Sequence, residues 1–177
     1  KDIDIPSPRY AQYSIDQDPN FIAENVDYPC VLKPLSLTAS QGGIRANDAK
    51  EFIIAFKRIK TLLVRIGEAK DNNILKTILV EDYVDGSEVA LEGLMVNGKL
   101  TTLAIFDKPD PLTGPFFEET IYVTPSQKPK TVLEPIKNLT EQAANSIGLA
   151  NGPIHAEIRV QEDGENKNTT PWIIEIA

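Results

Sequence analysis

A hydrophobic spacing of three to four residues marks two segments of the chain as helices. In residues 47–63, apolar side chains recur as they do on the buried face of an amphipathic helix. Asn47 or Asp48 can cap its start, because short polar side chains accept hydrogen bonds from first-turn amides. Residues 132–148 repeat the spacing. We expect two long helices here, and a short helix within the polar, proline-containing residues 1–25.

Short apolar or alternating runs predict the strands. They lie at residues 28–34, 74–84, 88–96, 99–106, 116–124, 153–160 and 172–177. Asn97 and Gly98 separate two of these runs, and both central positions of a tight hairpin turn need the positive φ that Asn and Gly tolerate. The segment 107–115 holds three prolines and a glycine, so we expect a loop there. This order of elements predicts an α+β fold with mostly antiparallel sheets.

Alternation along the last two strands places charged side chains on one face. In residues 154–160, His155, Glu157 and Arg159 point one way and the apolar side chains point the other way. Glu175 lies on the polar face of the last strand. If both apolar faces cover one core, the register is fixed, with these partners: Val160 and Trp172, Ile158 and Ile174. Glu157 then lies directly opposite Glu175.

Two carboxylates at directly opposed positions destabilise a sheet unless something neutralises them. A divalent cation is one explanation, because Mg²⁺ binds one or two carboxylates together with phosphate oxygens. Neutralisation by Arg159 is a second explanation, and a face that is simply solvated is a third. The residues alone leave these three alternatives open.

Composition narrows the class of protein. The 177 residues are 41% hydrophobic and 25% charged, which is ordinary for a globular chain with a core. A net charge of −8 disfavours an extended nucleic-acid groove, because it would repel phosphates. No run of about 18 apolar residues occurs, so we expect no membrane span. Cys30 is the only cysteine, which excludes a disulfide framework and fits a reducing cytoplasm.

Three stretches, taken in order and spacing, resemble one known superfamily. They are YPCVLKPLSLTASQGGIRA at 28–46, LVEDYVDGSEVALEG at 79–93, and the closing pair HAEIRV and IIEIA. On these stretches the chain is identified as a member of the ATP-grasp superfamily, from about Ile5 onward. The resemblance implies two lobes, with mostly antiparallel sheets and flanking helices, that clasp ATP. We expect these parts: an irregular segment at 1–25, a small lid lobe at 26–84, and a larger lobe at 85–177 that is truncated at its C-terminus.

The resemblance implies phosphate contacts in the first lobe. Lys33 matches the lysine that contacts the ATP phosphates, and a compact cation suits that task. Residues 38–43 match the small lid over the phosphates, in which Ser40 can donate a hydrogen bond while Gly42 and Gly43 allow close backbone approach. Neither a Walker sequence nor GxGxxG occurs. The alternatives are a surface lysine and an ordinary flexible loop.

The segment that links the lobes matches the part that reads adenine, largely through main-chain groups. Glu81 corresponds to a polar adenine contact, while the side chains of Tyr83 and Val84 mostly pack. Glu88 matches the carboxylate that binds the ribose hydroxyls, because an acceptor-only group suits a diol. An exposed strand glutamate is the alternative, and it is our interpretation of Glu92.

The resemblance also implies a metal site. Glu157 and Glu175 match the Mg²⁺ ligands of the superfamily, a site that Mn²⁺ can also fill. Many members carry an asparagine two residues after the second glutamate, where this chain has Ala177. An alanine there resembles the branch that includes bacterial dipeptide-forming L-amino acid ligases, beside the carbamoyl-phosphate synthase-like members. Water or phosphate oxygens would then complete the metal's ligands.

Several other side chains have open roles. Arg159 could touch phosphate in catalysis or balance the charge of the two glutamates. We expect His155 to pack or form hydrogen bonds rather than to catalyse. In the proline-rich loop, Glu119 or Glu118 could hold a substrate amine, with a solvated acidic turn as the alternative. Lys108 is equally ambiguous.

Taken together, the matches imply an ATP-dependent carboxylate-amine ligase in the intact protein. A substrate carboxylate would attack the γ-phosphate to give an acyl phosphate and ADP, and an amine would then displace phosphate. The reaction needs ATP, Mg²⁺ and small-molecule carboxylate and amine substrates. Two alternatives stay open: a bicarbonate-using carboxylase or carbamoyl-phosphate-type enzyme, and a non-catalytic nucleotide-binding module. The sequence predicts no oligomeric state, and we expect the chain alone to be inactive.

Overall fold

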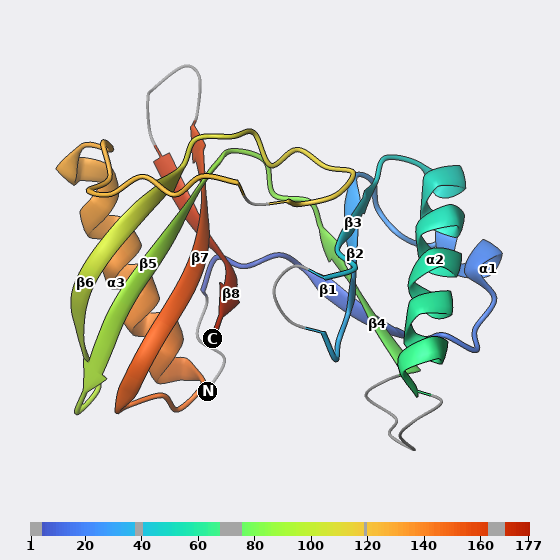
Figure 1. Cartoon of the computed structure of the whole chain (residues 1–177), viewed down its shortest axis with the longest axis horizontal. Coiled ribbons are helices and arrows are strands. Elements are labelled where there is room, and N and C mark those ends of the chain that lie inside the picture. The colour runs from blue at the N-terminus through green and yellow to red at the C-terminus, as the bar shows by residue number, and fades with distance from the viewer. Residues whose placement is uncertain (1–4, 38–40, 68–75, 119, 163–168) are drawn as a thin grey trace. The chain divides into compact units, whose positions relative to one another are not determined.

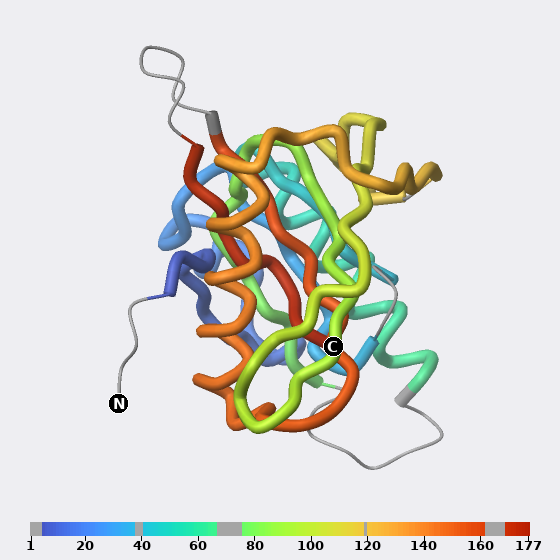
Figure 2. Tube along the Cα trace, turned by 90° about the vertical axis from the view of Figure 1, so that its left-hand side faces the viewer, coloured from blue at the N-terminus to red at the C-terminus, as the bar shows by residue number. Residues whose placement is uncertain are grey.

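The chain forms two compact units, and the computed structural model describes residues 5–37, 41–67, 76–118, 120–162 and 169–177 (Figures 1 and 2). Unit 1 is made of Lys1–Pro8, Val84–Pro111 and Glu119–Ala177, and unit 2 of Arg9–Tyr83 and Leu112–Glu118. The sequence places residues 1–25 outside both predicted lobes, whereas residues 9–25 are part of unit 2, because they add a strand and a short helix to it. Two predicted site residues, Ser40 and Glu119, lie outside the described residues.

Unit 2 contains a four-stranded antiparallel sheet in the order β1-β4-β2-β3. Its strands are β1 (Tyr10–Ser14), β2 (Cys30–Pro34), β3 (Ile44–Ala46) and β4 (Thr77–Asp82). The hydrophobic pattern predicts β2 and β4, which lie in the middle of the sheet. It misses the other two, because β1 is an edge strand with mostly exposed side chains and β3 has only three residues.

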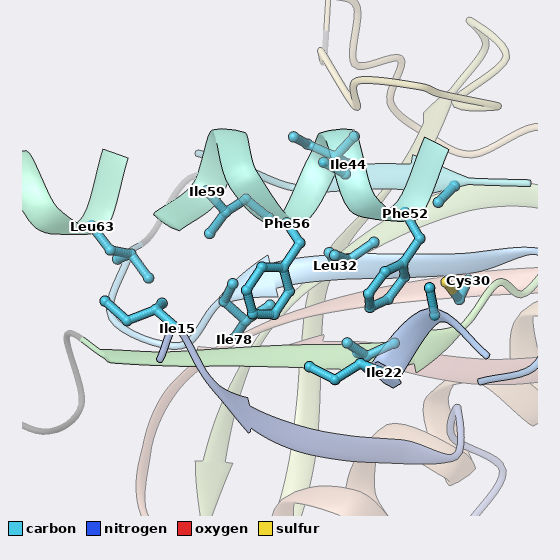
Figure 3. Packing of buried hydrophobic residues seen from close by; sticks show 14 residues of the cluster. Ile15, Ile22, Cys30, Leu32, Ile44, Phe52, Phe56, Ile59, Leu63 and Ile78 are labelled. Carbon is cyan, nitrogen blue, oxygen red and sulfur yellow. The ribbon is translucent and has the colours of Figure 1, made fainter. Parts of the chain in front are cut away.

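Two helices complete the hydrophobic core of unit 2: α1 (Pro19–Ala23) and α2 (Ala49–Gly67). Figure 3 shows Phe52 and Phe56 pointing from α2 toward Leu32 and Ile78 of the sheet. All four side chains are fully buried. Burial of one such side chain stabilises the fold by roughly 1.5–3 kcal/mol, so the apolar face of α2 is a main source of the stability of this unit.

The start of α2 is fixed by a reciprocal cap. The Asp48 carboxylate accepts a hydrogen bond from the Glu51 amide (2.9 Å), and the Glu51 carboxylate accepts one from the Asn47 amide (2.8 Å). Of the two residues predicted to cap this helix, Asp48 is the one that does so. The arrangement satisfies a first-turn amide that has no partner inside the helix, together with the amide just before the cap.

Cys30 lies in the core of unit 2 and gives the fold a dependence on pH. Its side chain is 1% exposed, and burial raises the pKa of the thiol to about 12. The unfolded thiol ionises near pH 9 while the folded one stays protonated, so stability falls as the pH rises from about 9 toward 12.

We expect this thiol to lower the free energy of unfolding by up to about 1.4 kcal/mol per pH unit in that range. Urea unfolding of the wild type and of Cys30→Ala, at neutral pH and near pH 10, checks this. The stability advantage of the wild type over the variant should shrink at the higher pH. An advantage that is the same at both pH values would contradict the expectation.

Unit 1 contains a second four-stranded antiparallel sheet, in the order β6-β5-β7-β8. Its strands are β5 (Ser87–Val96), β6 (Lys99–Lys108), β7 (Gly152–Glu162) and β8 (Thr169–Ile176). Helix α3 (Lys130–Ser146) runs along one face, as Figures 1 and 2 show, and its apolar side chains form a core with the strands. The predicted hairpin is confirmed, with φ of 50° at Asn97 and 77° at Gly98. None of the described helices is long and apolar enough to cross a membrane.

Two β-bulges shift the pairing within the sheet of unit 1. In the β5–β6 hairpin, the register changes next to Glu92 and leaves Leu103 unpaired. In the β7–β8 pair, it changes next to Glu157 and leaves Ile174 unpaired. A bulge adds one residue to one strand, so every partner beyond it moves by one position.

The second bulge corrects part of the predicted β7–β8 register. Glu157 pairs with Glu175, as predicted, but Ile158 pairs with Ile173 and not with Ile174. Ile173 is the side chain that enters the core, at 8% exposure. The same shift replaces the predicted Val160–Trp172 pair by two others: Val160 with Pro171, and Arg159 with Trp172. Simple alternation fails here because the extra residue reverses which side chains face the core.

The strand predicted at 116–124 does not form in the described part of that stretch. In that part, Phe116 forms an isolated bridge with Ile44, and Val123 forms one with Asp107. The stretch is divided between the two units after Glu118, so it has no single sheet edge to join. Strand β6 in turn continues to Lys108, which shortens the loop predicted at 107–115.

Candidate functional site

The face of the unit 1 sheet that α3 does not cover carries a group of charged side chains. Glu88 on β5 has Lys108 of β6 and Arg159 of β7 as its register partners. Its two carboxylate oxygens accept hydrogen bonds from Lys108 Nζ (2.7 Å) and Arg159 Nε (2.9 Å). The side chains are 8%, 3% and 5% exposed, in that order. A carboxylate this deeply buried needs such partners, and here two cations compensate it.

Lys108 also reaches a second carboxylate, on β7. Its Nζ lies 2.9 Å from Glu157 Oε1. Ala90 is the β5 residue that pairs with Glu157, and its methyl group leaves room for the lysine to cross the strand. Lys108 therefore links Glu88 to Glu157. The sequence gives Lys108 no definite role, because its position opposite Glu88 depends on the bulge in the β5–β6 hairpin.

Glu157 and Glu175 lie directly opposite each other in the β7–β8 pair. Glu175 is exposed, and the Glu157 side chain is 14% exposed. Lys108 neutralises Glu157 in part, yet the opposed carboxylates still disfavour this pairing unless a further cation is present. In the described ranges there is no group of three or more His, Cys, Asp or Glu ligands. A cation bound here would complete its ligands with water or phosphate oxygens.

His155 lies two positions before Glu157 on the same face, between two glutamates. Its Nδ1 is 2.7 Å from Glu92 Oε1, and its Nε2 is 3.7 Å from Glu157 Oε1. Burial opposes protonation of the ring, but Glu92 and Glu157 together outweigh it through their charges and hydrogen bonds, so the pKa of His155 is raised. His155 thus has the hydrogen-bonding role that we expect from the sequence, and it gives Glu92 a partner.

In unit 2, Lys33 and Glu81 form an ion pair on the sheet face that points away from the core. Lys33 Nζ lies 2.7 Å from Glu81 Oε2, and the side chains are 27% and 13% exposed. The two residues come from neighbouring strands, β2 and β4, that are far apart in the sequence. The sequence assigns one to phosphate and the other to adenine, whereas the structure brings them together as partners.

Local geometry explains the residue types at the other predicted nucleotide contacts. Gly42 has φ of 81°, a conformation that strains any residue with a Cβ, and Gly43 beside it is buried. The Tyr83 ring packs under the Arg45 guanidinium, with Cζ 3.9 Å from the ring centroid. Val84 is 7% exposed. The side chains of Tyr83 and Val84 therefore pack, as we expect from the sequence.

The candidate residues of the proline-rich loop divide between the units. Lys108 belongs to the charged face of unit 1, whereas Glu118 is exposed at the end of the segment that belongs to unit 2. Arg45 holds that segment, since its Nη1 donates to the Thr113 carbonyl (2.9 Å) and its amide donates to the Pro115 carbonyl (2.9 Å). The segment is thus a fixed part of unit 2.

A family model described as an ATP-grasp domain matches residues 26–176. The chain belongs to the ATP-grasp family. The match includes β2 to β8, and with them the charged face of unit 1 and the Lys33–Glu81 pair of unit 2. The ATP-grasp fold that the sequence resemblance implies is therefore confirmed.

Known relatives of this ATP-grasp chain include ligases. Alanine–anticapsin ligase of Bacillus subtilis (strain 168) is 28% identical in an alignment 166 residues long, which covers 87% of this chain and 34% of that protein. D-alanine–D-alanine ligase of Cupriavidus pinatubonensis is 24% identical in an alignment 178 residues long, which covers 95% of this chain and 50% of that protein. The crystal structure of an L-amino acid ligase from Bacillus licheniformis is similar at a TM-score of 0.73 and 27% identity, covering 98% of this chain and 36% of that one. The chain thus spans between 34% and 50% of the length of these relatives.

Proposed function

We propose that this chain is the Mg-ATP-binding part of an ATP-dependent carboxylate-amine ligase. The observation that carries the proposal is the opposed Glu157–Glu175 pair, on the sheet face that also bears Glu88 and Lys108. The relatives support ligase chemistry, since the two curated relatives and the crystal structure compared with this chain are named ligases. The activity would belong to the intact protein, to which this chain contributes the nucleotide-binding part.

The opposed glutamates fit a Mg²⁺ or Mn²⁺ ion. Mg²⁺ takes one or two carboxylates and keeps its other positions for water and phosphate oxygens, and a cation would offset the repulsion between Glu157 and Glu175. When bound, the ion would neutralise charge on the phosphates during phosphoryl transfer. Ala177 has no side-chain oxygen, so the chain's contribution would be these two carboxylates.

Glu88 would bind the ribose hydroxyls in this proposal. Its oxygens already accept from Lys108 and Arg159, but each carboxylate oxygen has a second lone pair that a hydroxyl can use. The two cations hold the carboxylate in one orientation, which is what recognition of a diol requires.

In unit 2, Lys33 would contact the ATP phosphates, and the amides of Gly42 and Gly43 would donate to them. Glu81 would serve both as the partner that orients Lys33 and as the polar contact for adenine. Ser40 and Glu119 keep their expected roles in this proposal, as a donor in the lid and as a contact for the substrate amine.

The proposed reaction has two steps. A carboxylate oxygen of the substrate attacks the γ-phosphorus of ATP, the bond to the bridging oxygen breaks, and ADP leaves. An amine then attacks the acyl carbon, and phosphate leaves with the former carboxylate oxygen. The protein supplies positive charge and alignment rather than a nucleophile, and Lys33 would supply part of that charge beside the metal ion.

Small molecules fit this chain better than macromolecules as partners. We propose that its partners are ATP, an amino acid that supplies the carboxylate, and a small amine. A polynucleotide is disfavoured as a partner because the chain has a net charge of −8. A cytoplasmic location is part of the proposal, and it is supported by Cys30, which is a free, buried thiol.

Phosphate release by the intact protein, with ATP and Mg²⁺ and a panel of amino acids, tests the proposed function. We expect release that requires an amino acid, and formation of a hydroxamate when hydroxylamine is added, because hydroxylamine traps an acyl phosphate. Release that depends on bicarbonate alone would favour a carboxylase or carbamoyl-phosphate-type enzyme. Tight ATP binding without release would favour a nucleotide-binding module. Either of these two results would overturn the ligase assignment.

A further inference from the structure

Arg159 bridges two parts of unit 1 that lie on either side of a turn. Its Nε donates to Glu88 Oε2 (2.9 Å), and its Nη1 donates to the Val84 carbonyl (2.8 Å). The side chain is 5% exposed. The planar guanidinium carries its donors in a rigid fork, so bonds on two sides fix its orientation and that of both acceptors.

The turn between these two acceptors packs closely against β7. Gly86 lies in the middle of it with φ of 117°, and a Cβ there would come within 2.3 Å of the Val160 carbonyl oxygen. Val160 is the neighbour of Arg159 in the chain. The segment from Val84 to Glu88 is therefore held to β7 by backbone packing at Gly86 and by Arg159 at its two ends.

Glu88 keeps one cation as a partner when Arg159 is removed. Without Arg159, Glu88 would still have a cation at 2.7 Å on its other oxygen. Two things would change: one carboxylate oxygen would lose its partner, and the Val84 carbonyl would lose its donor. Both changes affect the orientation of groups, and they come with the loss of one positive charge, so a substitution that keeps the charge, Arg159→Lys, is needed to tell the two effects apart.

We propose that Arg159 is a positioning residue for the adenosine part of ATP. It orients the Glu88 carboxylate toward the ribose hydroxyls and fixes the Val84 main chain, which borders the segment that reads adenine. This inference rests on the proposed function, in which Glu88 binds the ribose. It assigns Arg159 a role through Glu88 and Val84 in place of contact with the ATP phosphates, because its Nε and Nη1 already donate to these two residues and the side chain is buried.

Discrimination between ATP and 2′-deoxy-ATP tests this role, measured by calorimetry on the intact protein. The wild type should prefer ATP by about tenfold, since a hydrogen bond to a charged group is worth about that factor. In Arg159→Met the preference should fall to about twofold or less. Arg159→Lys should retain part of it, because a lysine can donate to Glu88 alone. Lys99→Met, which removes an exposed cation paired with Glu141, should keep the wild-type preference.

The outcomes separate this inference from the proposed function. A wild type that binds neither nucleotide overturns the proposed function. An Arg159→Met protein that binds with the full preference for ribose overturns the inference and leaves the function in place. If Arg159→Met does not fold, Arg159→Lys is measured instead, both in the wild-type protein and in the Glu88→Gln variant. The lysine substitution should reduce the preference for ATP over 2′-deoxy-ATP in the wild-type protein, and it should leave the preference of the Glu88→Gln variant unchanged. Equal changes in both backgrounds would overturn the role through Glu88.

Discussion

Replacing both Glu157 and Glu175 with glutamine is expected to remove the Mg²⁺-dependent part of ATP binding. In the wild type, Mg²⁺ should raise the affinity for ATP by at least about tenfold, the scale on which changes at metal sites alter affinity. In the double variant, the affinity should be equally weak with Mg²⁺ and with a chelator. Glutamine keeps the size of the side chain and removes the charge that attracts the cation. Calorimetric titration of ATP into each protein, in both buffers, measures the effect.

The stability of the double variant distinguishes loss of a site from loss of the fold. Removing both charges relieves the repulsion between the opposed glutamates but takes one partner from the buried Lys108, so we expect a folded variant with a modestly lowered melting temperature. Glu134→Gln is the matched control, since it removes one charge from α3, which packs against the other face of the sheet. A stimulation by Mg²⁺ that survives in the double variant would mean that the metal binds elsewhere.

Lys108→Met is expected to be among the most destabilising single substitutions in unit 1. The side chain is 3% exposed, and its ammonium group lies 2.7 Å from Glu88 and 2.9 Å from Glu157. Loss of one partner from a buried ion pair leaves the other charge uncompensated, which costs roughly 3–5 kcal/mol. Because Arg159 still compensates Glu88, we expect a loss near the lower end, about 3 kcal/mol, in the free energy of unfolding in urea.

A double-mutant cycle shows whether that loss comes from the buried charge. Lys108→Met combined with Glu88→Gln removes the cation together with one of its carboxylates. The combined loss should be smaller than the sum of the single losses by at least about 1 kcal/mol. Strict additivity would contradict the coupling of Lys108 and Glu88. Lys99→Met serves as the control on an exposed lysine and should leave the stability almost unchanged.

The position of Lys108 illustrates what strand alternation leaves undetermined. Counting back from the hairpin turn without a bulge sets Glu88 opposite Asp107, which would place two carboxylates together. The unpaired Leu103 shifts the register by one, and Glu88 meets Lys108 instead. Hydrophobic alternation identifies the strands and the turn, but a bulge depends on backbone geometry that the pattern does not encode.

The Glu157–Glu175 pair is predicted correctly, although strand alternation misplaces the neighbouring pairs and misses the bulge. The sequence-based register starts from Val160 opposite Trp172, which is wrong by one position, and it assumes no bulge. The bulge restores the lost position, so the pairing of the two glutamates holds. What the sequence does determine is that both side chains lie on the polar face of their strands, because Ala156 faces the core beside them.

The Lys33–Glu81 pair depends on a feature that no local pattern contains, the order of strands in the sheet. Strands β2 and β4 are neighbours although β3 and α2 lie between them in the sequence. The resemblance assigns each residue a separate contact with the nucleotide. Their ion pair follows only from the observed pairing of the strands.

The central claim is that Glu157 and Glu175 bind the metal ion of Mg-ATP. A crystal of the intact protein with Mn²⁺ and a non-hydrolysable ATP analogue, examined by anomalous scattering at the manganese edge, tests it most directly. The claim predicts an anomalous peak about 2.1 Å from a carboxylate oxygen of each glutamate and next to the nucleotide phosphates. A nucleotide-bound Mn²⁺ ion that touches neither glutamate would contradict it.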